Sequence, residues 1–147
     1  MIQENVSLQY RNVISKKYKF HYTKAQECME NFITTTKDQG MKISGGLFYS
    51  ICNINKEAET EMEFFVPVLN KTTLPDETYR FHSYYSVENM ISEVITADFE
   101  ERMEFAYAKL IQYATDNKME MISPIYNEVH KYKNKAFIVV KVAVKRR

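Results

Sequence analysis

Several features that are common in secreted proteins and in metalloproteins are scarce in this chain of 147 residues. It contains no Trp, three Gly, three Pro and only two Cys. Cys28 and Cys52 are isolated from each other, and isolated thiols are more often reduced packing residues than parts of a disulfide or a metal site. We therefore expect both cysteines to be buried and reduced.

The charge balance and the hydropathy exclude two further classes of protein. With 20 basic and 19 acidic residues the net charge is +1, which gives no global positive field for nucleic acid. The terminal "VKRR", Val144–Arg147, is expected to be a solvated end. No apolar run approaches the roughly 18 residues of a membrane span, and "MIQENVSLQY" lacks the features of a signal peptide. We expect a cytoplasmic protein that binds neither a membrane nor, directly, nucleic acid.

Catalytic and cofactor motifs are also missing. His21, His82 and His130 are widely spaced, without the HExxH or His-x-His pairing of a metal site. No G-x-S-x-G elbow, P-loop or G-x-G-x-x-G is present, and "ISGG" at Ile43–Gly46 is only a turn. The sequence therefore predicts a protein without metal or cofactor that is not an enzyme.

What remains is typical of a packed globular protein, because 45% of the residues are hydrophobic and 14% are aromatic. The length predicts one domain, residues 1–147. Two helices are indicated. Thr23, with Gln26 three residues later, has the pattern of a capping box, and Gly40 marks the end of this helix. A second helix is predicted from about Asp98 to about Asn117.

Outside the helices the hydrophobic period changes to two, or to short apolar runs, which predicts strands. The polar stretches between them, "INKEAETE", "NKTTLPDE" and "KYKNK", have turn chemistry. The predicted strands are Val6–Ser15, Gly46–Asn53, Glu61–Leu69, Thr78–Tyr85, Met90–Thr96, Pro124–Lys131 and Ala136–Val144.

The order of these elements occurs twice. Met41 corresponds to Met119 at an offset of 78, and at the same offset Phe32 corresponds to Leu110 and Phe48 to Tyr126. The strand that follows matches at an offset of about 76, "FFVPV" against "VKVAV". We therefore predict two βαββ halves, about 5–69 and 78–144. Their strands would form one antiparallel sheet with both helices on one face and a concave cleft on the other, an α+β fold.

A double βαββ unit of this size resembles the GyrI-like family, which includes effector-binding domains of multidrug-sensing transcription regulators and stand-alone small-molecule-binding or gyrase-modulating proteins. The motifs that carry the resemblance are "EFFVPV" (Glu63–Val68), "LPDETY" (Leu74–Tyr79), "FAYAKLIQYA" (Phe105–Ala114) and "PIYNEVHKY" (Pro124–Tyr132). There is also a vaguer likeness to small Firmicute proteins of this fold that are found beside type VII secretion genes.

The sequence departs from the family pattern at two places. "TADF", Thr96–Phe99, stands where the family has a His-x-Gly-x-Tyr entry to the second helix. "SYYSVENMISEV", Ser83–Val94, looks like an extra hairpin. No helix-turn-helix lies within the sequence, so we do not expect a complete regulator.

The resemblance implies that Glu128 is the carboxylate that counters a cationic, lipophilic ligand in an aromatic cleft. Ligand cations and aromatic rings would offset the cost of burying this charge. Glu63 is its approximate counterpart in the first half. The alternative for Glu128 is a solvent-exposed position, paired with Lys131 or Lys141. The aromatic residues that would line the cleft, or simply pack the core, are Phe48, Tyr49, Phe64, Tyr84, Tyr85, Tyr107 and Tyr126.

Three functions follow from these features. The favoured one is non-catalytic binding of a small amphipathic or cationic ligand. The second is an adaptor or chaperone-like module, in which an exposed hairpin of Thr78–Tyr85 and Met90–Thr96 binds a protein partner, such as a type VII secretion substrate, or a second copy in a homodimer. The least favoured is hydrolysis of reactive electrophiles, which some GyrI-like relatives perform with a cleft Glu and Tyr.

Overall fold

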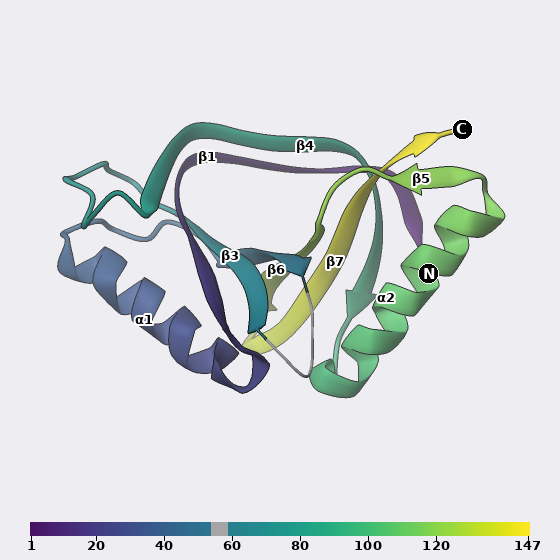
Figure 1. The fold of residues 1–147 in the computed structure, drawn as a ribbon, viewed down its shortest axis with the longest axis horizontal. Helices are drawn as coiled ribbons and strands as arrows, with labels where there is room; N and C mark the ends of the chain where they lie inside the picture. Colours follow the sequence, from purple (N-terminus) through teal and green to yellow (C-terminus); the bar gives the residue numbers. More distant parts are fainter. Residues whose placement is uncertain (54–58) are drawn as a thin grey trace. The chain divides into compact units, whose positions relative to one another are not determined.

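The computed structural model describes residues 1–53 and 59–147, which form seven β-strands, two α-helices and a short 3-10 turn (Figure 1). The predicted connection "INKEAETE" lies partly outside the described residues. The chain divides into two compact units. We call residues Tyr10–Tyr85 the N-terminal unit, and Met1–Gln9 together with Ser86–Arg147 the C-terminal unit.

The N-terminal unit contains three antiparallel strands and the first residues, Tyr79–Tyr85, of a fourth, and it is covered by one helix. β3 (Glu59–Pro67) pairs with β1 (Gln3–His21) on one side and with β2 (Phe48–Asn53) on the other. α1 (Ala25–Asp38) packs its buried Phe32 onto one face of these strands. The buried residues of this core are Ile14, Phe20, Phe32, Met41, Met62, Phe64, Val66, Val68 and Tyr79.

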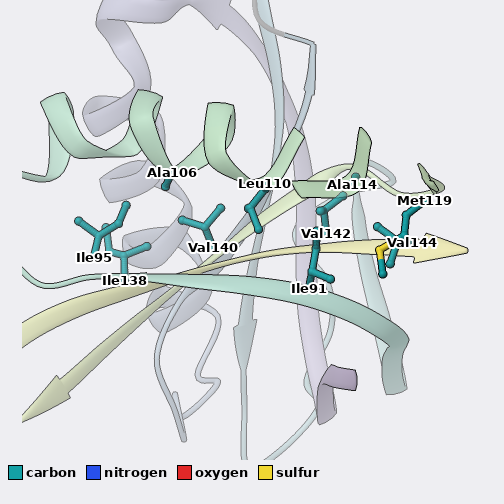
Figure 2. Packing of buried hydrophobic residues seen from close by; sticks show 10 residues of the cluster. All are labelled: Ile91, Ile95, Ala106, Leu110, Ala114, Met119, Ile138, Val140, Val142 and Val144. Carbon is teal, nitrogen blue, oxygen red and sulfur yellow. The ribbon is translucent and has the colours of Figure 1, made fainter. Parts of the chain in front are cut away.

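The C-terminal unit is built around β7 (Lys135–Arg146), which pairs antiparallel with three strands. These are β4 (Tyr79–Ile95), β5 (Met119–Met121) and β6 (Ile125–Tyr132). α2 (Phe99–Asp116) covers one face, and Figure 2 shows Ala106, Leu110 and Ala114 pointing from this helix toward the strands. The buried residues of this second core are Ile91, Ile95, Ala106, Leu110, Ala114, Met119, Ile138, Val140, Val142 and Val144.

The register of the two hairpins follows the two offsets found in the sequence. In the N-terminal unit Tyr49 pairs with Phe64, and in the C-terminal unit Asn127 pairs with Val140. Tyr49 and Asn127 are related by the offset of 78, and Phe64 and Val140 by the offset of 76. The predicted α+β class, with antiparallel strands and two helices, is confirmed. The single domain and the bounds of the halves stay predictions.

The predicted extra hairpin within Ser83–Val94 is wrong. β4 runs as one strand from Tyr79 to Ile95, without a turn (Figure 1). Asn89 has a left-handed backbone (φ 57°) inside this strand, a conformation that Asn tolerates better than most residues. A single left-handed residue is typical of a bulge rather than of a reversal of the chain. The break between the two predicted strands is therefore an irregularity within one long strand.

The predicted start of the first helix is also wrong. Thr23 belongs to the 3-10 turn Tyr22–Lys24, and α1 begins at Ala25 after Lys24, which makes no side-chain cap. The Thr23 hydroxyl instead bonds to His21 Nδ1 at 2.9 Å. The other helix bounds are confirmed: Gly40 has a φ of 82° directly after the end of α1, and α2 runs from Phe99 to Asp116.

Smaller differences concern strand lengths and the cysteines. β1 extends to His21, beyond the predicted Ser15, because the alternating pattern continues through a lysine-rich stretch whose side chains reach solvent. The short strand β5 was not predicted. Both cysteines are free, but Cys52 is exposed, so the expectation of two buried thiols is wrong. Within the described residues, no helix has the length and apolar character needed to cross a membrane.

The core of the C-terminal unit gives the first testable prediction. Leu110 is fully buried between α2 and the strands, whereas its neighbour Ile111 is 48% exposed. Leu110→Ala should lower the free energy of unfolding by about 2–5 kcal/mol, because it removes buried contacts and leaves a cavity. Ile111→Ala is the matched control and should cost less than about 1 kcal/mol. Urea denaturation measures both, and equal losses would contradict this assignment of the buried face.

Candidate ligand site

Strand alternation decides which predicted site residues share a surface. In the β2–β3 hairpin, Tyr49 and Phe64 point toward α1 and its core. Phe48 and Glu63 point to the opposite face, because neighbouring residues of a strand alternate in direction. Burial raises the pKa of Tyr49 to about 12, as expected for a hydroxyl in this core. The structure thus separates Tyr49 and Phe64 from Phe48 and Glu63.

The face of the N-terminal unit opposite α1 carries a stack of aromatic rings. Tyr10 stacks on Phe48 with ring centroids 4.5 Å apart, and Phe48 stacks on Phe65 at 4.6 Å with an interplanar angle of 4°. Tyr85 leans on Phe65 at 4.8 Å. Phe48 and Phe65 are fully buried, while Tyr10 and Tyr85 are half-buried. The rings of Tyr10 and Tyr85 are therefore the solvent-accessible part of this stack, and the buried rings of Phe48 and Phe65 form an aromatic base beneath them.

Glu63 lies on this same face, paired across the hairpin with Ser50. Its carboxylate is half-buried and accepts a hydrogen bond of 2.9 Å from the Ser15 hydroxyl. Within residues 1–53 and 59–147, no ion pair involves Glu63. A negative charge beside an aromatic base without a paired cation is suited to a cationic ligand.

His82 completes the polar part of this site. Its Nε2 lies 2.9 Å from the Ser15 hydroxyl, and its ring contacts Phe65 and Tyr85. Desolvation lowers the pKa of His82, although Glu63 acts in the other direction. His82 and Glu63 touch the same hydroxyl, and Ser15 is fully buried. This geometry differs from a nucleophilic triad, in which the base is oriented by the carboxylate and the hydroxyl reaches the substrate.

Glu128, the residue implied by the resemblance, has a different environment in the C-terminal unit. It is only 4% exposed, so the solvent-exposed alternative is wrong, but its predicted pairing with Lys141 is present. Lys141 Nζ lies 2.5 Å from Glu128 Oε1 and also donates a 2.7 Å hydrogen bond to the Ser7 carbonyl. His130 Nε2 is 3.8 Å from the same carboxylate oxygen. The Glu128 charge is therefore already countered within the chain.

The two predicted tyrosines of this unit lie on opposite faces of the β6–β7 hairpin. Tyr126 pairs directly with Lys141, on the same face as Glu128. Tyr107 lies on α2 and exchanges hydrogen bonds of 3.0 and 3.2 Å with the side chain of Asn127, on the helix-facing side. Tyr126 is thus placed with Glu128, whereas Tyr107 is not.

Glu63 and Glu128 occupy corresponding levels of the two hairpins. Glu63 on β3 pairs with Ser50, and Glu128 on β6 pairs with Val139. By the same two offsets, Ser50 corresponds to Glu128 and Glu63 to Val139, so the predicted correspondence of Glu63 with Glu128 is wrong. Each unit therefore has one carboxylate at this pair of positions, on the hairpin face that points away from the helix. In the N-terminal unit it comes from β3, and in the C-terminal unit from β6.

Several residues of the aromatic site were not among the predicted ones, namely Tyr10, Ser15, Phe65 and His82. The period of the strand was the signal that could have found Phe65. It lies two residues from Glu63 and so shares its face, whereas the predicted Phe64 does not. Ser15 and His82 come from strands distant in sequence, and no local pattern identifies them. No group of metal-ligating side chains was found among the described residues.

The fold is that of a small α+β domain of the GyrI-like type, with one helix-covered core in each unit. The chain belongs to the family described as Domain of unknown function (DUF5085), whose profile matches residues 9–146. No curated protein sequence matches it.

Solved structures support the fold. The chain is similar to EcmrR in the EcmrR–DNA complex of EcmrR-RPo (TM-score 0.75, 11% identity), covering 99% of this chain but 58% of that one. It is similar to the EcmrR C-terminal domain (TM-score 0.71, 10% identity, 100% of this chain and 99% of that one). It is also similar to SAV2435 bound to tetraphenylphosphonium (TM-score 0.52, 10% identity, 99% and 93%).

The buried pair of Glu128 and Lys141 gives the second prediction. Lys141→Met removes the closest cation from a buried carboxylate and should lower the free energy of unfolding by about 3–5 kcal/mol at pH 7. Lys145→Met, on the same strand, is the control. Lys145 Nζ lies 3.8 Å from Glu120 Oε2, and both side chains are largely exposed. The free energy of unfolding should therefore fall by only about 0–1 kcal/mol. Chemical denaturation of both variants decides, and similar losses would show that Glu128 does not depend on Lys141.

Proposed function

We propose that this chain is a non-catalytic binding protein for a small amphipathic cation, and that Glu63 and the aromatic face of the N-terminal unit form its binding surface. The observation that carries the proposal is the environment of Glu63. This carboxylate is half-buried beside stacked rings, and it forms no ion pair within the described part of the chain. A bound cation would supply the missing countercharge.

The physical chemistry of the site favours a lipophilic cation over a small hydrated ion. A partly desolvated carboxylate attracts positive charge more strongly than an exposed one. A cation near a tyrosine or phenylalanine face gains about 0.5–2 kcal/mol, depending on desolvation. The half-buried rings of Tyr10 and Tyr85 would contact the apolar substituents of the ligand, with Phe48 and Phe65 as a fixed base behind them.

Glu63 is a better candidate for the countercharge than Glu128. A ligand at Glu128 would have to compete with Lys141, whose ammonium already lies 2.5 Å from the carboxylate. Glu63 offers its charge without displacing a cation of the chain. We therefore place Glu63 and Phe48 in the proposed binding surface, and we do not include Glu128 and Tyr126 in it.

The similar structures support this choice of ligand class. SAV2435, of similar fold, was solved with tetraphenylphosphonium, which is a lipophilic cation. The DNA complex belongs to EcmrR, and we propose no direct contact of this chain with nucleic acid. The adaptor role was based on a projecting hairpin that β4 does not form, so we do not favour it, and a link to type VII secretion stays a prediction.

Tetraphenylphosphonium is a suitable probe, because it carries a permanent charge and four aromatic rings. Isothermal titration calorimetry at pH 7.5 should detect binding to the wild-type protein. Glu63→Gln should weaken this binding about tenfold, which corresponds to the loss of about 1.4 kcal/mol. Glu128→Gln should change the affinity less than Glu63→Gln does.

Two controls separate charge from shape. Glu27→Gln removes an exposed carboxylate of α1 and should leave the affinity unchanged. Triphenylphosphine oxide, an uncharged relative of the probe, should bind more weakly and should not distinguish wild type from Glu63→Gln. Equal affinity of tetraphenylphosphonium for wild type and Glu63→Gln would refute the proposed role of Glu63, and the absence of any binding would refute the proposed ligand class.

A further inference from the structure

His82, Ser15 and Glu63 form a continuous polar chain within the N-terminal unit. Ser15 Oγ lies 2.9 Å from Glu63 Oε2 and 2.9 Å from His82 Nε2. Ser15 is fully buried, so its hydroxyl has no access to bulk water. The two titratable groups are thus joined through one fixed hydroxyl.

Proton counting decides which tautomer of His82 this chain requires. The Ser15 hydroxyl has one proton, and an ionised Glu63 can only accept. If Ser15 donates to Glu63, its oxygen must accept from His82, so Nε2 carries a hydrogen and Nδ1 carries the lone pair. Additional protonation of His82 therefore takes place at Nδ1 and leaves both hydrogen bonds intact. Only the charge next to Glu63 changes.

The groups around His82 set the pH range of this change. Desolvation by the surrounding rings and the charge of Arg80, on the same strand, lower the pKa of His82, whereas Glu63 on β3 raises it. Lys17 on β1 is the direct cross-strand neighbour of Glu63 and adds positive charge beside this carboxylate. Desolvation is the largest of these effects, so the pKa of His82 lies below its usual 6.5. His82 is therefore neutral at pH 7 and gains its proton as the pH falls below 6.5.

We propose that His82, positioned by Ser15, makes cation binding at Glu63 dependent on pH, because a proton on His82 and a ligand cation compete for the same carboxylate. This inference rests on the proposed ligand class. His82 acts on the Glu63 carboxylate through the Ser15 hydroxyl and not by direct contact with the ligand. Binding linkage is reciprocal, so a bound cation must also disfavour protonation of His82.

Tetraphenylphosphonium tests the competition, because the probe itself does not titrate. Its affinity for the wild-type protein should fall between pH 7.5 and pH 5.5 by at most about tenfold, since one unit of pKa coupling corresponds to a factor of about ten once His82 is fully protonated. His82→Gln keeps an N–H donor for Ser15 but cannot take up a proton. This variant should bind as the wild type does at pH 7.5, with most of the decrease at pH 5.5 removed.

His130→Gln is the matched control. His130 lies in the C-terminal unit, where it stacks on Phe137, and its replacement should leave the pH profile of the wild type unchanged. Protonation of carboxylates contributes equally to the pH dependence of binding in both histidine variants. The difference between their pH profiles therefore reports His82 alone. A His82→Gln variant with the full wild-type pH dependence would overturn the proposal.

A measurement without ligand separates this inference from the proposed function. Histidine side-chain NMR gives the pKa of His82 in the free protein, and this pKa should be lower in Glu63→Gln than in wild type, because the favourable charge is lost. If tetraphenylphosphonium bound at no pH, the proposed function would fail, while this pKa difference would still report the coupling. An unchanged His82 pKa in Glu63→Gln would refute the coupling itself.

Discussion

The alternation of side chains along the two hairpins is the constraint on which the rest of this structure depends. In each unit one face of the hairpin is committed to a helix and to an apolar core, and the other face is left for polar and aromatic groups. A shift of one residue in either register would exchange these faces. The apolar cores that hold α1 and α2 therefore also fix the position of each outer carboxylate.

The two carboxylates show how neighbouring groups decide what a buried or half-buried carboxylate can bind. Glu63 and Glu128 lie at the same level of corresponding hairpins. Glu128 faces Lys141, which neutralises it at 2.5 Å. Glu63 lies opposite Lys17 of β1 but forms no ion pair within the described residues, and its carboxylate accepts a hydrogen bond from a serine hydroxyl beside aromatic rings. Burying a charge is tolerated when it is paired, and a charge that is only hydrogen-bonded keeps its attraction for an external cation.

Much of the fold could be predicted because its signals are local and repeated. The left-handed Gly40 just beyond the C-cap of α1, and Glu100 and Glu101 in the first turn of α2, are local signals of helix ends. The predictions failed where a local signal had two interpretations. Thr23 resembles a cap but bonds to His21, and Ser83–Val94 resembles a hairpin but lies within the continuous strand β4. In both cases the local pattern alone could not choose between the two.

The sequence by itself determined the two offsets, the alternation of the hairpins and hence the face on which Glu63 lies, because these depend only on the spacing of residues along the chain. Only the tertiary structure decided which groups surround that carboxylate. Ser15 and His82 reach it from β1 and β4, and Lys141 reaches Glu128 from β7. The charge state and the usefulness of a carboxylate depend on neighbours within a few ångströms, and strand pairing selects those neighbours from positions far apart in the sequence.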